Sequence, residues 1–153
     1  MTKNKQLVSV LAFCCLLLFN SCSKKSDSIT DAVQAPYGST VDMGEPVDAL
    51  TVDGPSGIWF VEYRIFVFDS EGSPMNGIGI NLSTSTPYAV FANSGTSVDV
   101  TKTDLDGSVL VVVWVYGGQY FVDHPTATVA TFQVWSDIIV HNTVSAISLT
   151  KAF

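Results

Sequence analysis

The sequence predicts an all-β protein built around one antiparallel β-sandwich of about seven to nine strands. Apolar residues make up 47% of the 153 residues, and charged residues make up only 14%. From Ile58 onward the apolar residues are largely β-branched or aromatic, which strands favour. Short apolar or alternating runs are separated by turn residues at intervals of roughly 8–12 residues, a spacing typical of sandwiches and barrels. No run shows the 3.6-residue apolar period of an amphipathic helix.

Residues 103–115 form the most informative run, because a turn leads directly into an apolar strand. The turn contains Asp-Leu-Asp-Gly at residues 104–107, and Val109–Val115 contains only Val, Leu and Trp. A strand without a polar side must be covered on both faces or lie at the centre of a sheet. We therefore expect the other strands to be arranged around this one, with Trp114 in the core.

Residues 1–21 are predicted to be a signal peptide. Two lysines precede an apolar run of 13 residues, Leu7 to Phe19. As a helix this run is about 20 Å long, shorter than the roughly 30 Å hydrocarbon core of a bilayer. The run resembles a bacterial lipoprotein signal, in which Cys22, preceded by a small serine, is lipidated and becomes the mature N-terminus. An ordinary secretory signal with an incidental cysteine is the alternative.

Residues 22–57 are predicted to be the lipidated N-terminus and a flexible linker. Pro and Gly occupy seven positions between residues 36 and 57 and interrupt any regular pattern. One short strand near Val47–Val52 is the exception that we consider. Cleavage at Cys22 would leave no second cysteine for a disulfide or a zinc site.

The sandwich itself is predicted for residues 58–153. Turn residues such as Gly, Pro, Asn and Asp separate the expected strands. These strands are Val61–Phe68, Ile78–Ser83, Tyr88–Phe91, Ser97–Thr101, Val109–Val115, Gln119–Val122, Thr128–Trp135, Ile138–Val140 and Val144–Leu149.

Three motifs follow one another in the part of the chain from Val61 to Val122. An acidic turn with a Pro leads from one strand into an alternating strand; a Thr-Asp-x-x-Gly-x-Val sequence follows, and a Gly-x-Tyr-x-Val step comes one strand later. The residues that carry them are Asp69, Gly72, Pro74, Thr103, Asp104, Gly107 and Tyr120. This order resembles the bacterial Ig-like domains of group 1, the type repeated in invasin and intimin. The resemblance implies an Ig-like sandwich and carries over no catalytic residues.

The acidic turns are weak candidates for a calcium site, with Asp104 and Asp106 as the ligands. Clustered carboxylates and turn carbonyls suit Ca²⁺. The turns lack the remaining acidic ligands of a full calcium loop, so we favour a structural interpretation in which Asp caps the turn and Gly adopts a positive φ.

An enzyme is not expected from this sequence. His124 and His141 are the only histidines, and neither has the spacing of a metal site or a catalytic triad. No phosphate-binding loop occurs, and nothing singles out a pair of carboxylates. We expect neither a cofactor nor a metal.

Trp59 and Trp135 are candidate binding residues, since exposed aromatic rings can stack on sugars or contact proteins. A position in the core is the more common role of aromatic residues in strands.

The charge excludes some partners. The net charge is −7, and it becomes −9 from Cys22 onward because two of the seven basic residues lie in the signal and all 14 acidic residues follow it. This balance disfavours nucleic acid. We expect a non-catalytic, lipid-anchored cell-envelope protein for binding, adhesion or structural support, with an unknown protein or glycan ligand. The alternatives are a periplasm-facing accessory subunit of an envelope complex and a carbohydrate-binding module. The residue after Cys22 is Ser23 and not the Asp that retains many enterobacterial lipoproteins at the inner membrane. We therefore expect the outer membrane.

Overall fold

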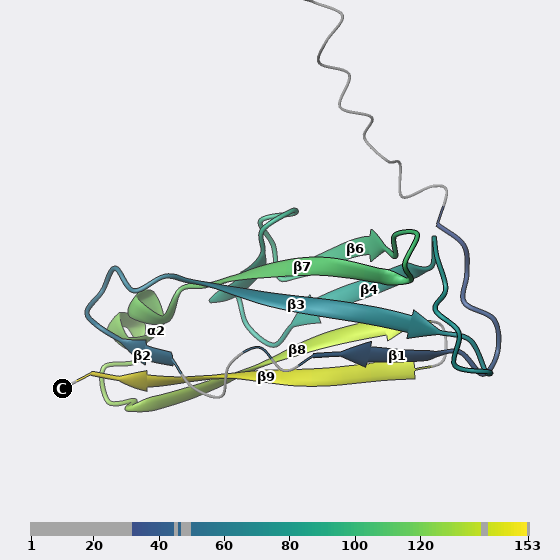
Figure 1. The fold of residues 1–153 in the computed structure, drawn as a ribbon. Helices are drawn as coiled ribbons and strands as arrows, with labels where there is room; N and C mark the ends of the chain where they lie inside the picture. Colours follow the sequence, from purple (N-terminus) through teal and green to yellow (C-terminus); the bar gives the residue numbers. More distant parts are fainter. Residues whose placement is uncertain (1–31, 45, 47–49, 139–140, 153) are drawn as a thin grey trace, which may run out of the picture.

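The computed structural model describes residues 32–44, 46, 50–138 and 141–152, and these form a two-layer β-sandwich (Figure 1). One sheet has the strand order β1-β3-β7-β5 and the other β2-β9-β8-β4-β6. The prediction of an all-β sandwich is therefore confirmed. The strands are β1 (Thr40–Met43), β2 (Leu50–Val52), β3 (Trp59–Phe68), β4 (Gly79–Thr84), β5 (Ala89–Phe91), β6 (Val98–Lys102), β7 (Ser108–Val115), β8 (Val129–Ile138) and β9 (His141–Lys151).

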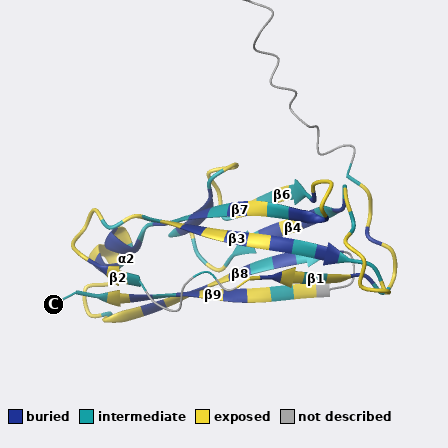
Figure 2. Cartoon of the chain, in the orientation of Figure 1, coloured by how far each residue is buried: buried dark blue, intermediate teal, exposed yellow. Residues whose placement is uncertain are grey.

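The core lies between the two sheets, where alternate residues of the long strands β3 and β8 point inward (Figure 2). Tyr63 and Ile65 of β3 belong to the same core cluster as Ile147 and Leu149 of the other sheet, and all four side chains are almost completely buried. Burying a side chain of this size contributes about 1.5–3 kcal/mol to stability. Burial of alternate side chains between the sheets thus stabilises the sandwich, and the burial pattern of β3 follows this period of two.

Strand β7 lies between β3 and β5, so its predicted central position is confirmed. Of the two arrangements expected for an apolar strand, the central position holds and coverage of both faces does not. Val111, Val113 and Val115 point into the core, whereas Leu110 lies on the outer face with half of its surface exposed. Trp114 also lies on this outer face and is only half-buried, so it is not a core residue.

The folded part of the chain begins earlier than the predicted boundary at residue 58. Strand β1 pairs with β3, and β2 pairs with the C-terminal strand β9. Met43 and Val52 are both buried in the core. From residue 32 onward, the described residues of the expected linker therefore belong to the sandwich. The short strand expected near Val47–Val52 corresponds to β2, which covers Leu50–Val52. Residues 47–49 lie outside the described residues.

A short helix, α2 (Gly117–Asp123), replaces the strand predicted at Gln119–Val122. Gly118 allows the backbone to approach the loop before β3, since an added Cβ would lie 2.5 Å from the carbonyl carbon of Pro55. The Gly118 N–H donates to the Gly57 carbonyl at 2.9 Å. Phe121, one turn later, is buried beneath the helix. Close approach at the glycines and burial of Phe121 therefore favour a helix over a strand here.

The predicted sandwich is antiparallel throughout, and this is wrong at one edge. Strand β2 runs parallel to β9, with Leu50 opposite Leu149. The run expected at Ile138–Val140 is not a separate strand in the part described, because Ile138 ends β8. Among the described residues, we find no helix long and apolar enough to cross a membrane.

Candidate functional site

Two of the predicted motif turns lie together at the end of the sandwich opposite α2 (Figure 1). In the first turn, Asp69 Oδ1 accepts hydrogen bonds from the N–H groups of Glu71 at 2.9 Å and Ser73 at 2.8 Å. In the second, Asp106 Oδ1 accepts from the N–H of Ser108 at 2.9 Å and from its hydroxyl at 2.8 Å. Both carboxylates therefore act as acceptors for the backbone of their own turns.

The two turns are in direct contact through Gly107 and Pro74. Gly107 has φ of 74°, and a Cβ built on it would lie 2.5 Å from the Cβ of Pro74 and 2.8 Å from the N of Met75. A side chain at residue 107 would therefore strain the backbone and displace the other turn. By contrast, Gly72 also has a positive φ, of 84°, but open space lies around its Cβ position.

Thr103 connects the same two loops by hydrogen bonds. Its hydroxyl donates to the Met75 carbonyl at 2.6 Å and accepts from the Ile78 N–H at 3.0 Å. Its carbonyl accepts from the Gly77 N–H at 2.9 Å. The residue is 2% exposed. We call this arrangement of residues 69–78 and 103–108 the turn junction.

The turn junction is also electrostatically ordered. The backbone and side-chain hydrogen bonds from Ser108, followed by the nearby Arg64 guanidinium, lower the pKa of the Asp106 carboxyl below its ordinary value. Arg64 Nη1 lies 3.9 Å from Asp106 Oδ2 and donates to the Ser108 hydroxyl at 3.1 Å. Because these groups are exposed, salt will screen the attraction between the charges.

Of the calcium candidates, Asp106 is engaged as a turn acceptor, and the backbone of Asp104 closes the same turn. The Asp104 N–H donates to the Ser108 carbonyl at 2.7 Å, and the Gly107 N–H donates to the Asp104 carbonyl at 3.0 Å. Across the described ranges, no group of three or more His, Cys, Asp or Glu side chains could hold a metal ion.

Tyr120, the last motif residue, lies at the other end of the sandwich, on α2. Its ring stacks on His124 at a centroid distance of 4.4 Å and meets Tyr88 edge-on at 5.4 Å. The Tyr88 hydroxyl donates to Asp123 Oδ2 at 2.7 Å, and this hydrogen bond is the main cause that raises the pKa of Tyr88. Tyr120 is thus not brought together with the other six motif residues.

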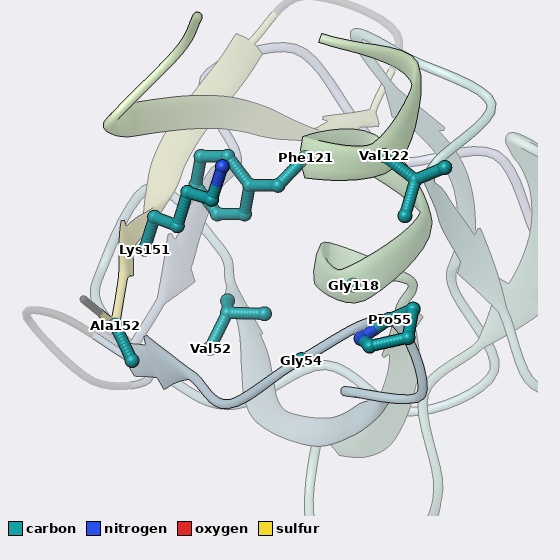
Figure 3. A pocket seen from close by; sticks show the side chains of 8 residues that line it. All are labelled: Val52, Gly54, Pro55, Gly118, Phe121, Val122, Lys151 and Ala152. Atoms are coloured by element: carbon teal, nitrogen blue, oxygen red, sulfur yellow. The ribbon is translucent and has the colours of Figure 1, made fainter. Parts of the chain in front are cut away.

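A cavity of about 190 Å³ opens beside α2, between the loop at Gly54–Pro55 and the end of β9 (Figure 3). Its lining includes Val52 and Phe121, both buried. Lys151 is the one charged side chain among the described residues that line it, and its Nζ already donates to the Pro125 carbonyl at 3.4 Å. The other lining residues are glycine, alanine, proline, valine and phenylalanine, so among these lining residues Lys151 alone can donate a hydrogen bond from its side chain.

The two candidate tryptophans lie in different sheets and on different kinds of face. Trp59 of β3 is on the inward-pointing side of its strand and packs against the core, beside Gly57 and Gly117. Trp135 of β8 lies between the buried Val134 and Ser136, on the same outer face of the five-stranded sheet as the exposed Gln133. The structure therefore does not combine them into one aromatic surface. Cys22 lies outside the described residues.

Exposed apolar residues lie on the outer face of the four-stranded sheet, and they were not predicted from the sequence. Phe60 is 68% exposed, and its ring meets Trp114 edge-on at a centroid distance of 5.9 Å. The alternation of β3 could have indicated that Phe60 is exposed, because Phe60, Glu62 and Arg64 occupy the positions between its buried residues.

Comparison with known proteins assigns no family. No family model and no curated protein sequence matches the chain. Among solved structures, the chain is similar to PapD-like domain 7 of human CEP192, at 10% identity, 78% coverage of this chain, 90% of that chain and a TM-score of 0.38. It is also similar to AggA, the major subunit of aggregative adherence fimbriae type I from Escherichia coli, at 14% identity, 79% and 99% coverage and a TM-score of 0.36. At such TM-scores, these likenesses assign neither a family nor a function.

Proposed function

We propose that the chain is a non-catalytic, lipid-anchored protein of the bacterial cell envelope that binds a partner through the outer faces of its sheets. One observation carries the binding role: apolar side chains that the fold does not bury collect on an outer sheet face. Phe60 and Leu110, which are at least half exposed, lie there beside Trp114. Exposed apolar surface of this kind is typical of protein contact sites.

The non-catalytic part of the proposal is supported by the work that the polar motif residues already do. Asp69 and Asp106 cap turns, and the hydroxyl of Thr103 connects two loops. Catalysis needs a nucleophile, a base and an orienting group that converge on a free space. The residues of the turn junction instead bond to the protein's own backbone, as structural residues do.

The proposed anchor is the lipidated Cys22, with residues 23–31 as a short connection to the sandwich. This location rests on the signal-like sequence of residues 1–21. We favour the outer membrane. A binding role at the cell surface and an accessory role facing the periplasm both fit such an anchor.

Protease treatment of intact cells tests the location. The sandwich is followed with an antibody, and a soluble periplasmic protein serves as the control. Loss of the signal with an intact control would support surface binding or adhesion. Digestion only after lysis would support the periplasmic accessory role. Recovery of the protein in the soluble fraction, without membrane association, would contradict the anchored proposal in both forms.

Carbohydrate binding is the second candidate function, and the surroundings of Trp135 favour it. On the outer face of the five-stranded sheet, Trp135 lies opposite Ser83 and Val144. In the adjacent row, Asp137 lies between Asn81 and Asn142. An indole ring beside amide and carboxylate groups offers stacking and paired hydrogen bonds, which suit the hydroxyls of a sugar.

Glycan binding can be tested with a matched pair of tryptophan variants. Trp135→Ala should abolish binding to an envelope polysaccharide or a glycan array, because it removes the stacking ring. Trp114→Ala, on the outer face of the opposite sheet, should retain that binding. No binding by the unmodified chain, or equal losses in both variants, would exclude this second function.

A further inference from the structure

We propose that the outer face of the four-stranded sheet is the interface of a symmetric homodimer of this chain. We call this surface the β3–β7 face; it consists of Phe60, Glu62, Arg64, Leu110, Val112 and Trp114. The inference rests on the proposed binding role, because it uses the same apolar side chains, and it names a second copy of the chain as the partner. It does not depend on the lipid anchor, so a chain that stays monomeric would overturn the dimer and leave the anchor to its own test.

The β3–β7 face exposes apolar side chains. Phe60 and Leu110 are 68% and 50% exposed, and the half-buried Val112 and Trp114 lie beside them. In the register of the two strands, Phe60 is opposite Trp114 and Arg64 is opposite Leu110. Side chains on one face of such a pair lie about 5 Å apart, so they form one continuous surface.

The β3–β7 face also carries a charged side chain without a partner among the described residues. The carboxylate of Glu62 has no hydrogen bond or ion pair among the described residues. Arg64 follows two positions later on the same face, about 7 Å along the strand. Its Nη1 donates to the Ser108 hydroxyl and lies 3.9 Å from Asp106 Oδ2, but a guanidinium has five N–H donors, so several remain for another acceptor.

Glu62 and Arg64 make the β3–β7 face complementary to a second copy of itself, because one side chain is acidic and the other is basic. Consider a two-fold axis in the plane of the interface, perpendicular to the strands and passing between Glu62 and Arg64. The axis places Glu62 opposite Arg64 of the second copy, and Arg64 opposite the second copy's Glu62. Isologous interfaces of this kind need a single surface that complements itself.

The same axis matches three of the apolar residues of this face. It places Val112 opposite Leu110 of the second copy, and Phe60 opposite Phe66, which lies on the same side of β3. Trp114 lies opposite Ser108 of the second copy in this register. An axis parallel to the strands would instead set the charged residues of β3 against the apolar residues of β7. Because that arrangement leaves charges without partners, the perpendicular axis is favoured.

The size of the face sets the expected affinity. A stable interface buries about 800 Å² per partner. Strands lie about 4.8 Å apart and rise about 3.4 Å per residue, so a four-stranded face with few large side chains falls at the low end. We therefore expect a reversible dimer with a dissociation constant on the order of micromolar to tens of micromolar.

The test is sedimentation equilibrium of the chain beginning at Ser23, which retains every described residue. Concentrations from about 1 to 500 µM cover the expected range. The unmodified chain should change from monomer to dimer across this range. A monomer at every concentration would overturn the proposal, as would association into larger species without a dimer.

Charge reversal then tests the axis. Glu62→Arg and Arg64→Glu should each weaken the dimer at least about tenfold, because each places like charges opposite one another. An equimolar mixture of the two variants should form a heterodimer, because each facing pair then joins an arginine of one variant to a glutamate of the other. Lys102→Glu, on the outer face of the other sheet, should dimerise as the unmodified chain does.

Circular dichroism establishes that each variant is folded. If either reversal variant is unfolded, Leu110→Asp replaces it as the test of the face, since this exposed residue has no structural hydrogen bond to lose. Folded reversal variants that still dimerise alone, or a mixture that remains monomeric, would exclude the proposed interface.

Discussion

Gly107 lies directly against Pro74, so that a Cβ at residue 107 would be 2.5 Å from the Cβ of Pro74. The two residues belong to turns that are separated in the sequence by strands β4, β5 and β6, and their contact closes one end of the sandwich. Together with the hydrogen bonds of Thr103, it makes the turn junction a structural unit.

Gly107→Ala should destabilise the protein by about 3 kcal/mol, because the positive φ costs an alanine about 1–2 kcal/mol and the contact with Pro74 adds strain. Gly72→Ala is the matched control, since Gly72 also has a positive φ but no atom lies within 4 Å of its Cβ position. The control should lose only about 1 kcal/mol. Urea unfolding measures both, and equal losses would show that the contact with Pro74 is unimportant.

Thr103→Val should cost about 2–4 kcal/mol. The substitution keeps the shape of the side chain but leaves the Ile78 N–H and the Met75 carbonyl without their partner. Thr131→Val, at an exposed position of β8, should stay within about 0.5 kcal/mol of the unmodified protein. Denaturant midpoints decide the matter, and a neutral Thr103→Val would mean that water replaces the hydroxyl.

Asp106 should contribute a pH-dependent part of the stability. Its folded pKa lies below the ordinary value, so its contribution is fully present above the ordinary pKa of an aspartate, about 4. The contribution is lost as the pH falls through the lower, folded pKa. Asp106→Asn should therefore lose less stability than the unmodified protein between neutral pH and about pH 2. Melting temperatures that fall in parallel for the two proteins would contradict this role.

The N-terminal boundary of the sandwich can be tested by truncation. A chain that begins at residue 58 lacks β1 and β2, and with them the buried Met43 and Val52. This truncation should lower the free energy of unfolding by more than about 5 kcal/mol, because it also uncovers neighbouring core residues. The chain should then show no cooperative unfolding transition. A chain that begins at residue 32 should unfold as the full-length protein does. Equal melting temperatures for the two truncated chains would show that β1 and β2 do not contribute to the stability of the sandwich.

Local patterns were sufficient for the central strands and for the turn chemistry. The alternation of β3 and the apolar run of β7 reflect burial of one face, and Asp-x-x-Gly sequences indicate tight turns. The contact between Gly107 and Pro74 could not be predicted in this way. It depends on how two strands are aligned, which neither turn records alone.

Two elements escaped prediction for different reasons. Strand β1 is four residues long, and its position follows from pairing with the distant end of β3, Thr40 opposite Phe68. In α2, Gly117 and Phe121 are one helical turn apart and both buried, but the segment is too short to show a helical period. Trp114 was assigned to the core because an all-apolar strand conceals which side chains face outward.

The most direct test of the proposed function is mass spectrometry of the mature N-terminus, on protein purified from the membrane fraction of bacterial cells that express the full chain. The proposal predicts an N-terminal peptide that begins at Cys22 and carries a diacylglyceryl group on Sγ. The Cys22→Ser variant should lack this modification. It should no longer be recovered as a processed protein in the membrane fraction. A mature N-terminus at another residue, or an unmodified thiol at Cys22, would contradict the lipid anchor.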